Sequence, residues 1–389
     1  MEKPRTILHL DLDAFFCAVE EIKDPSLRGK AFAVGGDPRG RGVVSSCSYA
    51  ARKYGVHSAL PMAQAVKRCP HLIIVRGDHR RYSFYSRKVI GLLQDLTDQV
   101  EKLSIDEAFV ELTNLDRDPA ELGAHLQRKI LEKLGLPNSV GIASNKLVAK
   151  TATDVGKLSA SGGSPPNALT VVPPGEEAEF LAPLPVDMLW GVGPKTKAAL
   201  GHMGVETIGD LAAVPPIELA NALGKHGYQL SKRARGIDQR PIVTDREVKS
   251  ISHEHTFRRD RDQRNELIAE INRLAGKVSR RLQNKHLQGR TIQIKLRWSD
   301  FSTLTRQITL ERSIQDAKPI AKHSRELFSQ VWEEGRKVRL IGVGVSGLDS
   351  PDRQLQLWDP RVEKDLKLQE TLNDLKKKFG EGSIQQGFE

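Results

Sequence analysis

The sequence predicts a multidomain protein of the α+β class. Its 389 residues exceed what one compact core usually holds, so we expect about two to four domains. Short β-branched, apolar runs and longer amphipathic runs both occur along the chain, which indicates strands and helices in mixed order. Two stretches lack these patterns and are typical of connectors, namely Ser159–Pro174 and Arg233–Val243.

The first half of the chain predicts a sheet with helices and a small subdomain. Thr6–Leu12 (TILHLDL) is apolar and ends in acids, as a buried strand that delivers carboxylates to its tip does. Ala31–Val34 and Gly42–Ser46 predict two strands of the subdomain around a Gly-rich turn. The other expected strands are Val100–Leu103, Ala108–Leu112 and Ser139–Ala143, and the expected helices are Phe15–Lys23, Tyr82–Leu96, Pro119–Leu134 and Asn145–Val155.

The second half predicts a helical region followed by a compact α+β module. Glu176–Leu223 holds short helices that Gly and Pro interrupt. From Glu247 to Leu348, β-like runs alternate with two helical runs, Asn265–Gln283 and Ala317–Glu333. The resulting order β-helix-β-β-helix-β suits a single α+β domain. Arg361–Phe379 predicts a final charged helix.

Charge indicates a polyanionic partner. The chain carries 60 Lys and Arg against 49 Asp and Glu, a net charge of +11 with a pI near 9.5. Such an excess favours nucleic acid, and the alternative is a basic but inert surface. Residues 241–350 alone hold 22 Lys and Arg and 14 Asp and Glu, so we expect this module to grip duplex DNA.

Cysteine usage and hydropathy predict a cytoplasmic protein with no membrane span. Cys17, Cys47 and Cys69 are sparse and form no C-x-x-C pair, which argues against a disulfide framework or a zinc knuckle. The first ten residues carry charges where a signal peptide needs an apolar core. The long uncharged stretch Leu158–Gly175 is rich in Ser, Gly and Pro and is expected to be a loop.

Two pairs of acids stand at the ends of expected strands. Asp11 and Asp13 end the first strand, on the same side by alternation, while Asp106 and Glu107 lie in or beside a turn between two strands. Gathered acids are unfavourable unless a cation compensates them, and two Mg²⁺ ions about 3.5–4 Å apart do so in phosphoryl transfer. One Asp-x-Asp pair is more often an ordinary turn or cap, but the distant second pair strengthens the metal interpretation.

Four motifs resemble those of the Y-family DNA polymerases, most of all the DinB-type branch. They are LDLDAFFCAVE (Leu10–Glu20), SSCSYAARKYGV (Ser45–Val56), SIDEAFVEL (Ser104–Leu112) and GIASNKLVAKTATDVGK (Gly141–Lys157). The resemblance covers nearly the whole chain in the expected order. It implies a palm (a β-sheet with helices) at residues 1–17 and 77–165, small fingers at 18–76, a helical thumb with a helix-hairpin-helix at 166–238, an α+β little finger at 239–350, and a tail at 351–389.

The resemblance also implies the catalytic residues. Asp11, Asp106 and Glu107 match the family's metal-binding acids, and with the carbonyl of Leu12 they are expected to hold two Mg²⁺ ions. Asp13 is expected to be a structural acid held by backbone N–H groups. Asn145, Lys146 and Lys150 are expected to have a structural or primer-side role outside the catalytic set.

A nucleotide site is implied by the same likeness. Ser46, Tyr49, Arg52 and Lys157 match the family's triphosphate-binding set, and together they offer a hydroxyl, a phenol, a guanidinium and an ammonium. Taken singly, Tyr49 could fill a core, Arg52 could form a surface ion pair and Lys157 could end a helix in solvent.

Two further residues are expected to select the sugar of the nucleotide and to leave room for the template base. Phe16 matches the aromatic steric gate that rejects a ribose 2′-hydroxyl, with a core phenylalanine as the alternative; Phe15 is expected in the core. Ser45 matches a small residue over the nascent base pair, which is consistent with lesion tolerance and low fidelity.

Two regions are expected to bind DNA. Leu184–Ala212 is similar to a helix-hairpin-helix, in which Gly191 and Gly193 let the backbone approach a phosphate and Lys195 and Lys197 add charge. This contact is independent of base sequence, as a polymerase requires. In the expected little finger we assign contacts to three arginines, Arg297, Arg306 and Arg339.

A short apolar peptide follows the expected little finger. Gln354, Leu355, Leu357 and Trp358 lie in QLQLW, which is similar to the Q-L-x-L-F peptide that bacterial polymerases insert into the β sliding clamp. Apolar anchors on a polar tail are expected to be buried by a partner. The alternative is packing against the final helix, and about 30 residues follow where the family motif often ends the chain.

Together these features predict a monomeric, distributive translesion DNA polymerase that adds dNTPs to a primer 3′ end on template DNA. Low fidelity and the absence of a proofreading exonuclease are part of this expectation. An inactive family member that acts as a scaffold on the clamp is the alternative, but it should have lost metal-binding acids. A palm-type nucleotide cyclase is a third hypothesis, against which the hairpin and the basic module argue.

Overall fold

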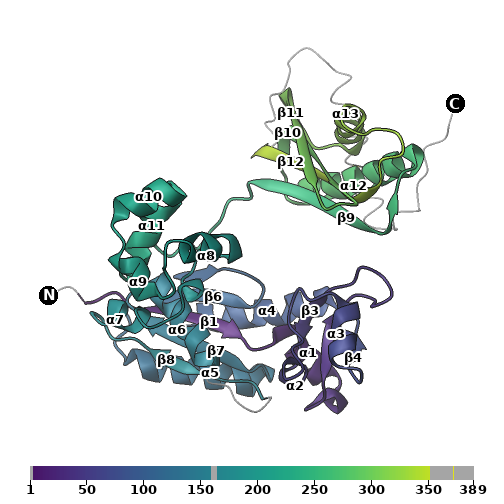
Figure 1. The fold of residues 1–389 in the computed structure, drawn as a ribbon. Coiled ribbons are helices and arrows are strands. Elements are labelled where there is room, and N and C mark those ends of the chain that lie inside the picture. The colour runs from purple at the N-terminus through teal and green to yellow at the C-terminus, as the bar shows by residue number, and fades with distance from the viewer. Residues whose placement is uncertain (1–2, 159–163, 351–370, 372–389) are drawn as a thin grey trace. The chain divides into compact units, whose positions relative to one another are not determined.

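The computed structural model describes residues 3–158, 164–350 and 371, and it divides into two compact units (Figure 1). The first unit runs to residue 247 and includes 257–259, and the second holds the rest. No helix in these described ranges is both long and apolar enough to cross a membrane. The expected clamp-binding residues Gln354, Leu355, Leu357 and Trp358 lie outside the described residues, and so does the expected final helix apart from Thr371.

A five-stranded sheet forms the base of the first unit. Its strand order is β5-β6-β1-β7-β8, with β5 (Val100–Lys102), β6 (Glu107–Glu111), β1 (Ile7–Leu12), β7 (Asn138–Ala143) and β8 (Leu169–Val171). β1 pairs antiparallel with both β6 and β7, so the first strand of the sequence lies at the centre of the sheet. Every residue of β7 is buried, as expected for a strand that is covered on both faces.

Helices cover the two faces of this sheet (Figure 1). On one face Leu8 and Leu10 share a core with the helices α1 (Phe15–Lys23), α4 (His79–Gln94) and α5 (Pro119–Leu134). On the other face Ile7 and Phe109 share a core with α6 (Lys146–Leu158). Alternation along β1 therefore turns Asp11 toward α6.

Gly141 allows α6 to lie directly on the sheet. A Cβ atom at this position would stand 2.1 Å from the carbonyl oxygen of Ala149, so no larger residue fits between β7 and the helix. The close approach brings the side chains of α6 within reach of those on β1 and β6.

A small three-stranded sheet and the helices beside it form the predicted subdomain. Its order is β3-β2-β4, with β3 (Val44–Cys47), β2 (Phe32–Gly35) and β4 (Ile73–Val75). The neighbouring helical elements are η1 (Pro25–Leu27), α2 (Tyr49–Arg52) and α3 (Met62–Arg68). The sequence predicted β2 and β3 but neither α3 nor β4, because β4 is only three residues long and α3 has no strong capping residue.

Short helices pack on the outer side of α6, as the interrupted pattern after residue 176 predicts. They are α7 (Glu177–Leu181), η2 (Val186–Met188), α8 (Pro194–Gly201), α9 (Ile208–Ala213), α10 (Pro216–Leu223) and α11 (Lys225–Ala234). Leu200, Leu211, Leu219 and Leu230 are buried in the core that contains α6. Only α11 was not predicted, and its last residues had been assigned to the tether.

The expected tether is held by hydrogen bonds to the first unit. We call residues 236–246 the strap. Asn145 Nδ2 donates to the Gly236 carbonyl at 2.9 Å, and Lys146 Nζ donates to the Pro241 carbonyl at 2.7 Å. The Val243 N–H donates to Glu101 at 3.0 Å. Buried side chains of Glu101 on β5, of Lys146 on α6 and of Asn145 before α6 thus take up backbone groups of this polar, basic segment.

The second unit has the predicted order β-helix-β-β-helix-β. Its elements are β9 (Ser250–Arg261), α12 (Arg264–Asn284), β10 (Gln288–Trp298), β11 (Thr303–Ile314), α13 (Ala317–Ser329) and β12 (Val338–Asp349). The strands form one antiparallel sheet, in the order β11-β10-β12-β9. On β10 the buried Ile292, Ile294 and Leu296 alternate with half-buried polar residues, so one face packs on the helices and the other is open.

Candidate active site

The three predicted catalytic acids converge at one end of the five-stranded sheet. Asp11 on β1 lies directly opposite Glu107 on β6, and side chains of such a pair project from the same face. Asp106 precedes β6, and its carbonyl accepts the Leu12 N–H at 3.0 Å. Residues that are about 95 positions apart in the chain are thus neighbours because β1 and β6 are adjacent strands.

Ser104 shapes the turn that carries two of these acids. Its Oγ accepts the N–H groups of Asp106 and Glu107 at 3.1 and 3.0 Å and donates to the Asp106 carboxylate. This turn follows β5, which confirms that the acids of the SIDE motif lie at or beside a hairpin turn, with Glu107 as the first residue of β6.

Lysines of α6 balance the acids. Lys157 Nζ lies 2.5 Å from Asp11 Oδ1 and 3.4 Å from Asp13 Oδ1, and Lys150 Nζ lies 2.8 Å from Glu107 Oε1. Lys150 and Lys157 are seven residues apart, about two helical turns, so both face the sheet. Burial opposes their charged forms, but nearby carboxylates raise the pKa of each lysine above its ordinary value, those of Asp154 and Glu107 for Lys150 and those of Asp11 and Asp13 for Lys157.

Asp11 needs positive charge nearby to remain ionised. Burial raises the pKa of Asp11 to about 7 despite the Lys157 ammonium, and the Glu107 and Asp106 carboxylates contribute to the increase. Hard carboxylate oxygens and a deficit of positive charge are what Mg²⁺ prefers. Within the described ranges, however, no three His, Cys, Asp or Glu side chains are arranged to hold an ion as they stand, since Lys150, Lys157 and Ser104 engage the carboxylates.

Asp13 has the contacts of a structural acid. It is fully buried, and both of its carboxylate oxygens accept Ser139 Oγ at 3.0 Å. The Asn167 N–H donates to it at 3.2 Å, which is the kind of backbone contact that the sequence predicted. Asp13 therefore joins β1 to β7 and to the segment before β8.

Phe16 lies on α1 directly after the acids, on a layer of aromatic side chains. Ala14 adopts a left-handed conformation (φ 46°) that turns the chain from β1 into α1. Phe15 is buried in the core as expected, whereas Phe16 is half-buried. The Phe16 ring stacks on the Tyr82 ring with centroids 4.1 Å apart and meets His79 edge-on at 5.7 Å.

The sequence did not identify the residues that support Phe16. Tyr82 is fully buried, and its hydroxyl donates to Glu20 at 2.7 Å. Tyr82 was assigned only to an amphipathic helix. No local pattern links α4 to α1, because the contact depends on how the two helices cross.

The expected triphosphate residues come from the small subdomain and from α6. Tyr49 and Arg52 lie on α2, and the Arg52 guanidinium stands 4.2 Å over the Tyr49 ring. Burial raises the pKa of Tyr49, and the Asp13 carboxylate adds to the effect, so the phenol lies within the electrostatic field of the acids. Ser46 is buried on β3, whereas Ser45 is exposed.

The predicted hairpin glycines precede α8. Gly191 has a positive φ of 112° and Gly193 is the N-cap of α8, so the N–H groups of the hairpin are gathered at a helix start. Lys195 is exposed on the first turn of α8. Lys197 pairs with Asp187 at 2.8 Å, which reduces the charge that it offers to a phosphate.

The three arginines that we assigned to DNA contacts lie at different places on the second unit. Arg297 lies on the open face of the sheet beside Lys295. Arg306 lies on the edge strand β11, opposite Ile294 on β10. The Ile294 side chain is on the helix-covered face of the sheet, so the Arg306 side chain projects from that face too. Arg339 stacks on Phe301 at 4.2 Å, next to a register shift in β12.

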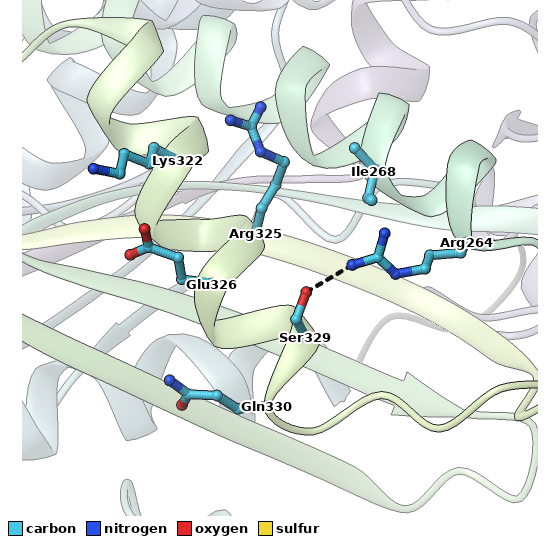
Figure 2. A pocket seen from close by; sticks show the side chains of 7 residues that line it. All are labelled: Arg264, Ile268, Lys322, Arg325, Glu326, Ser329 and Gln330. Atoms are coloured by element: carbon cyan, nitrogen blue, oxygen red, sulfur yellow. Dashed lines mark hydrogen bonds between the residues drawn. The ribbon is translucent and has the colours of Figure 1, made fainter.

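A hollow of about 700 Å³ lies between α12 and α13 (Figure 2). Arg264, Lys322 and Arg325 line it together with Glu326 and Gln330. Figure 2 shows Arg264 donating to Ser329, a bond of 3.0 Å. Arg325 donates to Asn272 at 2.8 Å. None of the predicted site residues lines this hollow.

Comparison with known proteins agrees with this geometry. The model of the impB/mucB/samB family matches residues 10–154, that of its C-terminal domain matches 248–357, and the IMS family HHH motif matches 174–205. The chain therefore belongs to the impB/mucB/samB family, the Y-family DNA polymerases, and is a DNA-directed DNA polymerase. The fold class expected from the sequence and the resemblance to this family are confirmed.

Its relatives place it in the DinB-type branch. The chain is 39% identical to DNA polymerase IV of Dehalococcoides mccartyi over 98% of this chain and 97% of that one. It is 44% identical to DNA polymerase IV of Streptomyces coelicolor, over 90% and 72% of the two chains.

Solved structures give the same result. A Y-family DNA polymerase chimera of Dbh and Dpo4 superposes with a TM-score of 0.78 at 27% identity, covering 89% of this chain and 99% of that one. An insertion ternary complex of Dbh DNA polymerase superposes with a TM-score of 0.62 at 26% identity and the same coverage.

Proposed function

We propose that this polymerase adds dNTPs to a primer 3′ end by two-metal phosphoryl transfer and is specialised for translesion synthesis. Asp11, Asp106, Glu107 and the Leu12 carbonyl would hold two Mg²⁺ ions. The observation that carries the proposal is the pairing of Asp11 with Glu107 across β1 and β6, with Asp106 beside them. Carboxylates that face lysines rather than solvent are poised to exchange ammonium groups for metal ions.

When bound, the two ions would activate the primer hydroxyl and neutralise charge on the phosphates. Ser46, Tyr49, Arg52 and Lys157 would hold the triphosphate by hydrogen bonds and charge. Lys157 has two tasks in this proposal, since the ammonium that balances Asp11 and Asp13 in the free protein becomes a ligand of the incoming phosphates. Asp13 keeps the end of β1 in place through Ser139.

Phe16 would select the sugar. Its ring is fixed from below by Tyr82 at 4.1 Å, so it cannot retreat when a 2′-hydroxyl approaches. A rigid aromatic surface discriminates by steric repulsion, which needs no polar contact to the sugar. Low fidelity and tolerance of damaged bases would follow from the small, exposed side chain of Ser45, which would lie over the nascent base pair.

Contacts to DNA would be made along the backbone. Gly191, Gly193, Lys195 and Lys197 would receive a phosphate at the start of α8, and Lys197 would first leave Asp187. In the second unit we assign the contact to the open face that holds Arg297, because hydroxyls of Ser252, Thr256, Thr291 and Thr305 share that face. The domain limits given by the resemblance, from the palm at 1–17 and 77–165 to the little finger at 239–350, are part of this proposal.

Recruitment to a β sliding clamp through Gln354, Leu355, Leu357 and Trp358 is proposed from the sequence alone. Deleting residues 354–358 should leave unassisted primer extension intact and remove its stimulation by the clamp; equal stimulation would count against the peptide. A monomer in the cytoplasm, without a proofreading exonuclease, completes the proposal. The three cysteines are free thiols in the structure.

The test is primer extension with Mg²⁺ opposite an undamaged and a damaged template base. Wild type should extend both, and Asp106→Ala should extend neither while binding primer-template DNA as tightly as wild type. Extension by Asp106→Ala would refute the metal assignment, and failure of the wild type opposite damage would refute the translesion assignment.

A further inference from the structure

The position of α6 along its own axis determines where two active-site lysines lie. The helix rises about 1.5 Å per residue, so a shift by one residue would displace Lys150 and Lys157 together from Glu107 and Asp11. Packing on Gly141 fixes the distance of the helix from the sheet. It does not by itself fix the register along the axis, to which the contact of Thr153 Oγ1 with the His9 ring at 2.9 Å and the hydrogen bonds at the start of the helix contribute.

Two side chains take up the N–H groups at the start of α6. Asn145 Oδ1 accepts the Val148 N–H at 3.1 Å, as an ordinary N-cap does. Asp238 Oδ2 accepts the Leu147 N–H at 3.1 Å, although Asp238 is 91 residues away in the strap. A carboxylate at a helix N-terminus is also favoured by the helix dipole.

Asp238 is held firmly in this place. Arg240 donates to both of its oxygens at 2.7 Å, and only 4% of the Asp238 side chain is exposed. Burial opposes ionisation, but the Arg240 donors keep the pKa of Asp238 below its ordinary value. Arg240 is itself fixed, because its guanidinium stands 4.3 Å over the Trp190 ring and its carbonyl accepts Arg5 at 2.9 Å.

We propose that Asp238 is a positioning residue for nucleotidyl transfer, which caps α6 from the strap and so keeps Lys150 and Lys157 in register with the catalytic acids. The inference rests on the proposed function of those acids. It differs from a simple contribution to stability, because a shifted α6 would misplace charges at the reacting centre while the fold persists.

The neighbouring helix α5 supplies a matched control. Its N-cap Asp118 accepts the Glu121 N–H at 2.9 Å, and α5 packs on the opposite face of the same sheet. None of the proposed site residues lies on α5. Removal of either cap leaves helix N–H groups without a partner, but only the cap on α6 is connected to the chemistry.

The experiment compares wild type, Asp238→Ala, Asp238→Asn and Asp118→Ala by the single-turnover rate of incorporation at saturating dNTP. Melting temperature and primer-template affinity are measured beside it. Wild type must extend the primer, since its failure would refute the proposed function and not this inference. Asp238→Ala should lose about tenfold in rate, as expected for a small misplacement of catalytic groups, with unchanged DNA affinity.

The other variants decide between positioning and stability. Asp238→Asn retains an oxygen that can accept the Leu147 N–H, so its rate should stay within about twofold of wild type. Asp118→Ala removes an exposed cap, so it should lower the melting temperature less than Asp238→Ala and leave the rate unchanged. A normal rate for Asp238→Ala would overturn the inference. So would an Asp238→Asn variant as slow as Asp238→Ala, or an equally slow Asp118→Ala.

Discussion

Charged side chains are shielded at the end of the five-stranded sheet of the first unit. On the open face of the second unit's sheet they are half exposed. At the first, Asp11 and Asp13 are shielded and share one ammonium, that of Lys157, and Glu107 has its own in Lys150. On the second, Lys295 and Arg297 are half exposed; Lys295 pairs with Glu254 at 2.9 Å, and Arg297 donates to the Thr303 hydroxyl at 2.9 Å.

This difference explains how one chain can combine catalysis with DNA binding that does not depend on base sequence. A shielded site concentrates its effect in a few groups, because electrostatic interactions are strong where water is excluded. An open, polar face spreads its effect over many weak contacts that salt screens. Substitutions should therefore have large, residue-specific effects at the first region and small effects at the second.

The largest effect is expected for Asp11→Asn. The substitution removes a proposed metal ligand and leaves Lys157 with Asp13 alone, so the rate of incorporation should fall by at least about 10³-fold. Primer-template affinity should not change. Asp116→Asn, at an exposed acid that pairs with Lys3, is the control and should match wild type. A rate near wild type for Asp11→Asn would show that substitutions at the end of the five-stranded sheet do not have larger effects than those on the open face.

Lys157→Met should cause the second largest loss in the rate of incorporation. Met occupies similar space without charge, so Asp11 and Asp13 lose their ammonium and the triphosphate loses a donor, and we expect about a 10²-fold lower rate. Lys129→Met, at a surface lysine that pairs with Asp95 at 3.5 Å, should have no effect. Steady-state and single-turnover kinetics would check this, and a change in apparent dNTP affinity alone would show that Lys157 only binds substrate.

Phe16→Ala should change selectivity more than rate. Removing the ring leaves space for a 2′-hydroxyl, and the buried Tyr82 cannot move to fill it. The preference for dNTPs over rNTPs should therefore fall by about one to two orders of magnitude. Competition between the two nucleotides on one template measures it. Phe84→Ala removes an exposed phenylalanine of α4 and serves as the control. Unchanged sugar preference would reject Phe16 as the gate.

Local sequence patterns predicted the site better than they predicted its support. The acids follow an apolar strand and a hairpin turn, so their place at a sheet end could be inferred from residues 6–12 and 100–112. By contrast, Tyr82 under Phe16 and Asp238 at the start of α6 depend on contacts between segments 66 and 91 residues apart, about which local patterns say nothing.

The strap and the arginines illustrate the same limit. Composition predicted a tether, but it could not show that the buried pair of Lys146 and Glu101, 2.8 Å apart, binds the backbone of this segment. Alternation predicts that neighbours on one strand face opposite ways, yet only the pairing of β10 with β11 shows that Arg306 shares a face with Ile294 rather than with Arg297.

The smallest effects are expected on the second unit, and a pair of variants tests the assignment of its faces. Arg297→Ala should weaken primer-template binding by less than about tenfold and reduce the slope of log affinity against log salt by about 1. Arg306→Ala should change neither. Titrations at several salt concentrations measure both, and equal losses for the two variants would place DNA on more than the open face.

Counting bound divalent ions tests the site most directly. Electron paramagnetic resonance with Mn²⁺ as the probe should find two ions per wild-type complex that holds primer-template and a non-hydrolysable dNTP analogue, and fewer in the same complex of Asp106→Ala. Equal numbers in the two proteins, or no ion bound by the wild type, would show that Asp11, Asp106 and Glu107 do not form the catalytic centre.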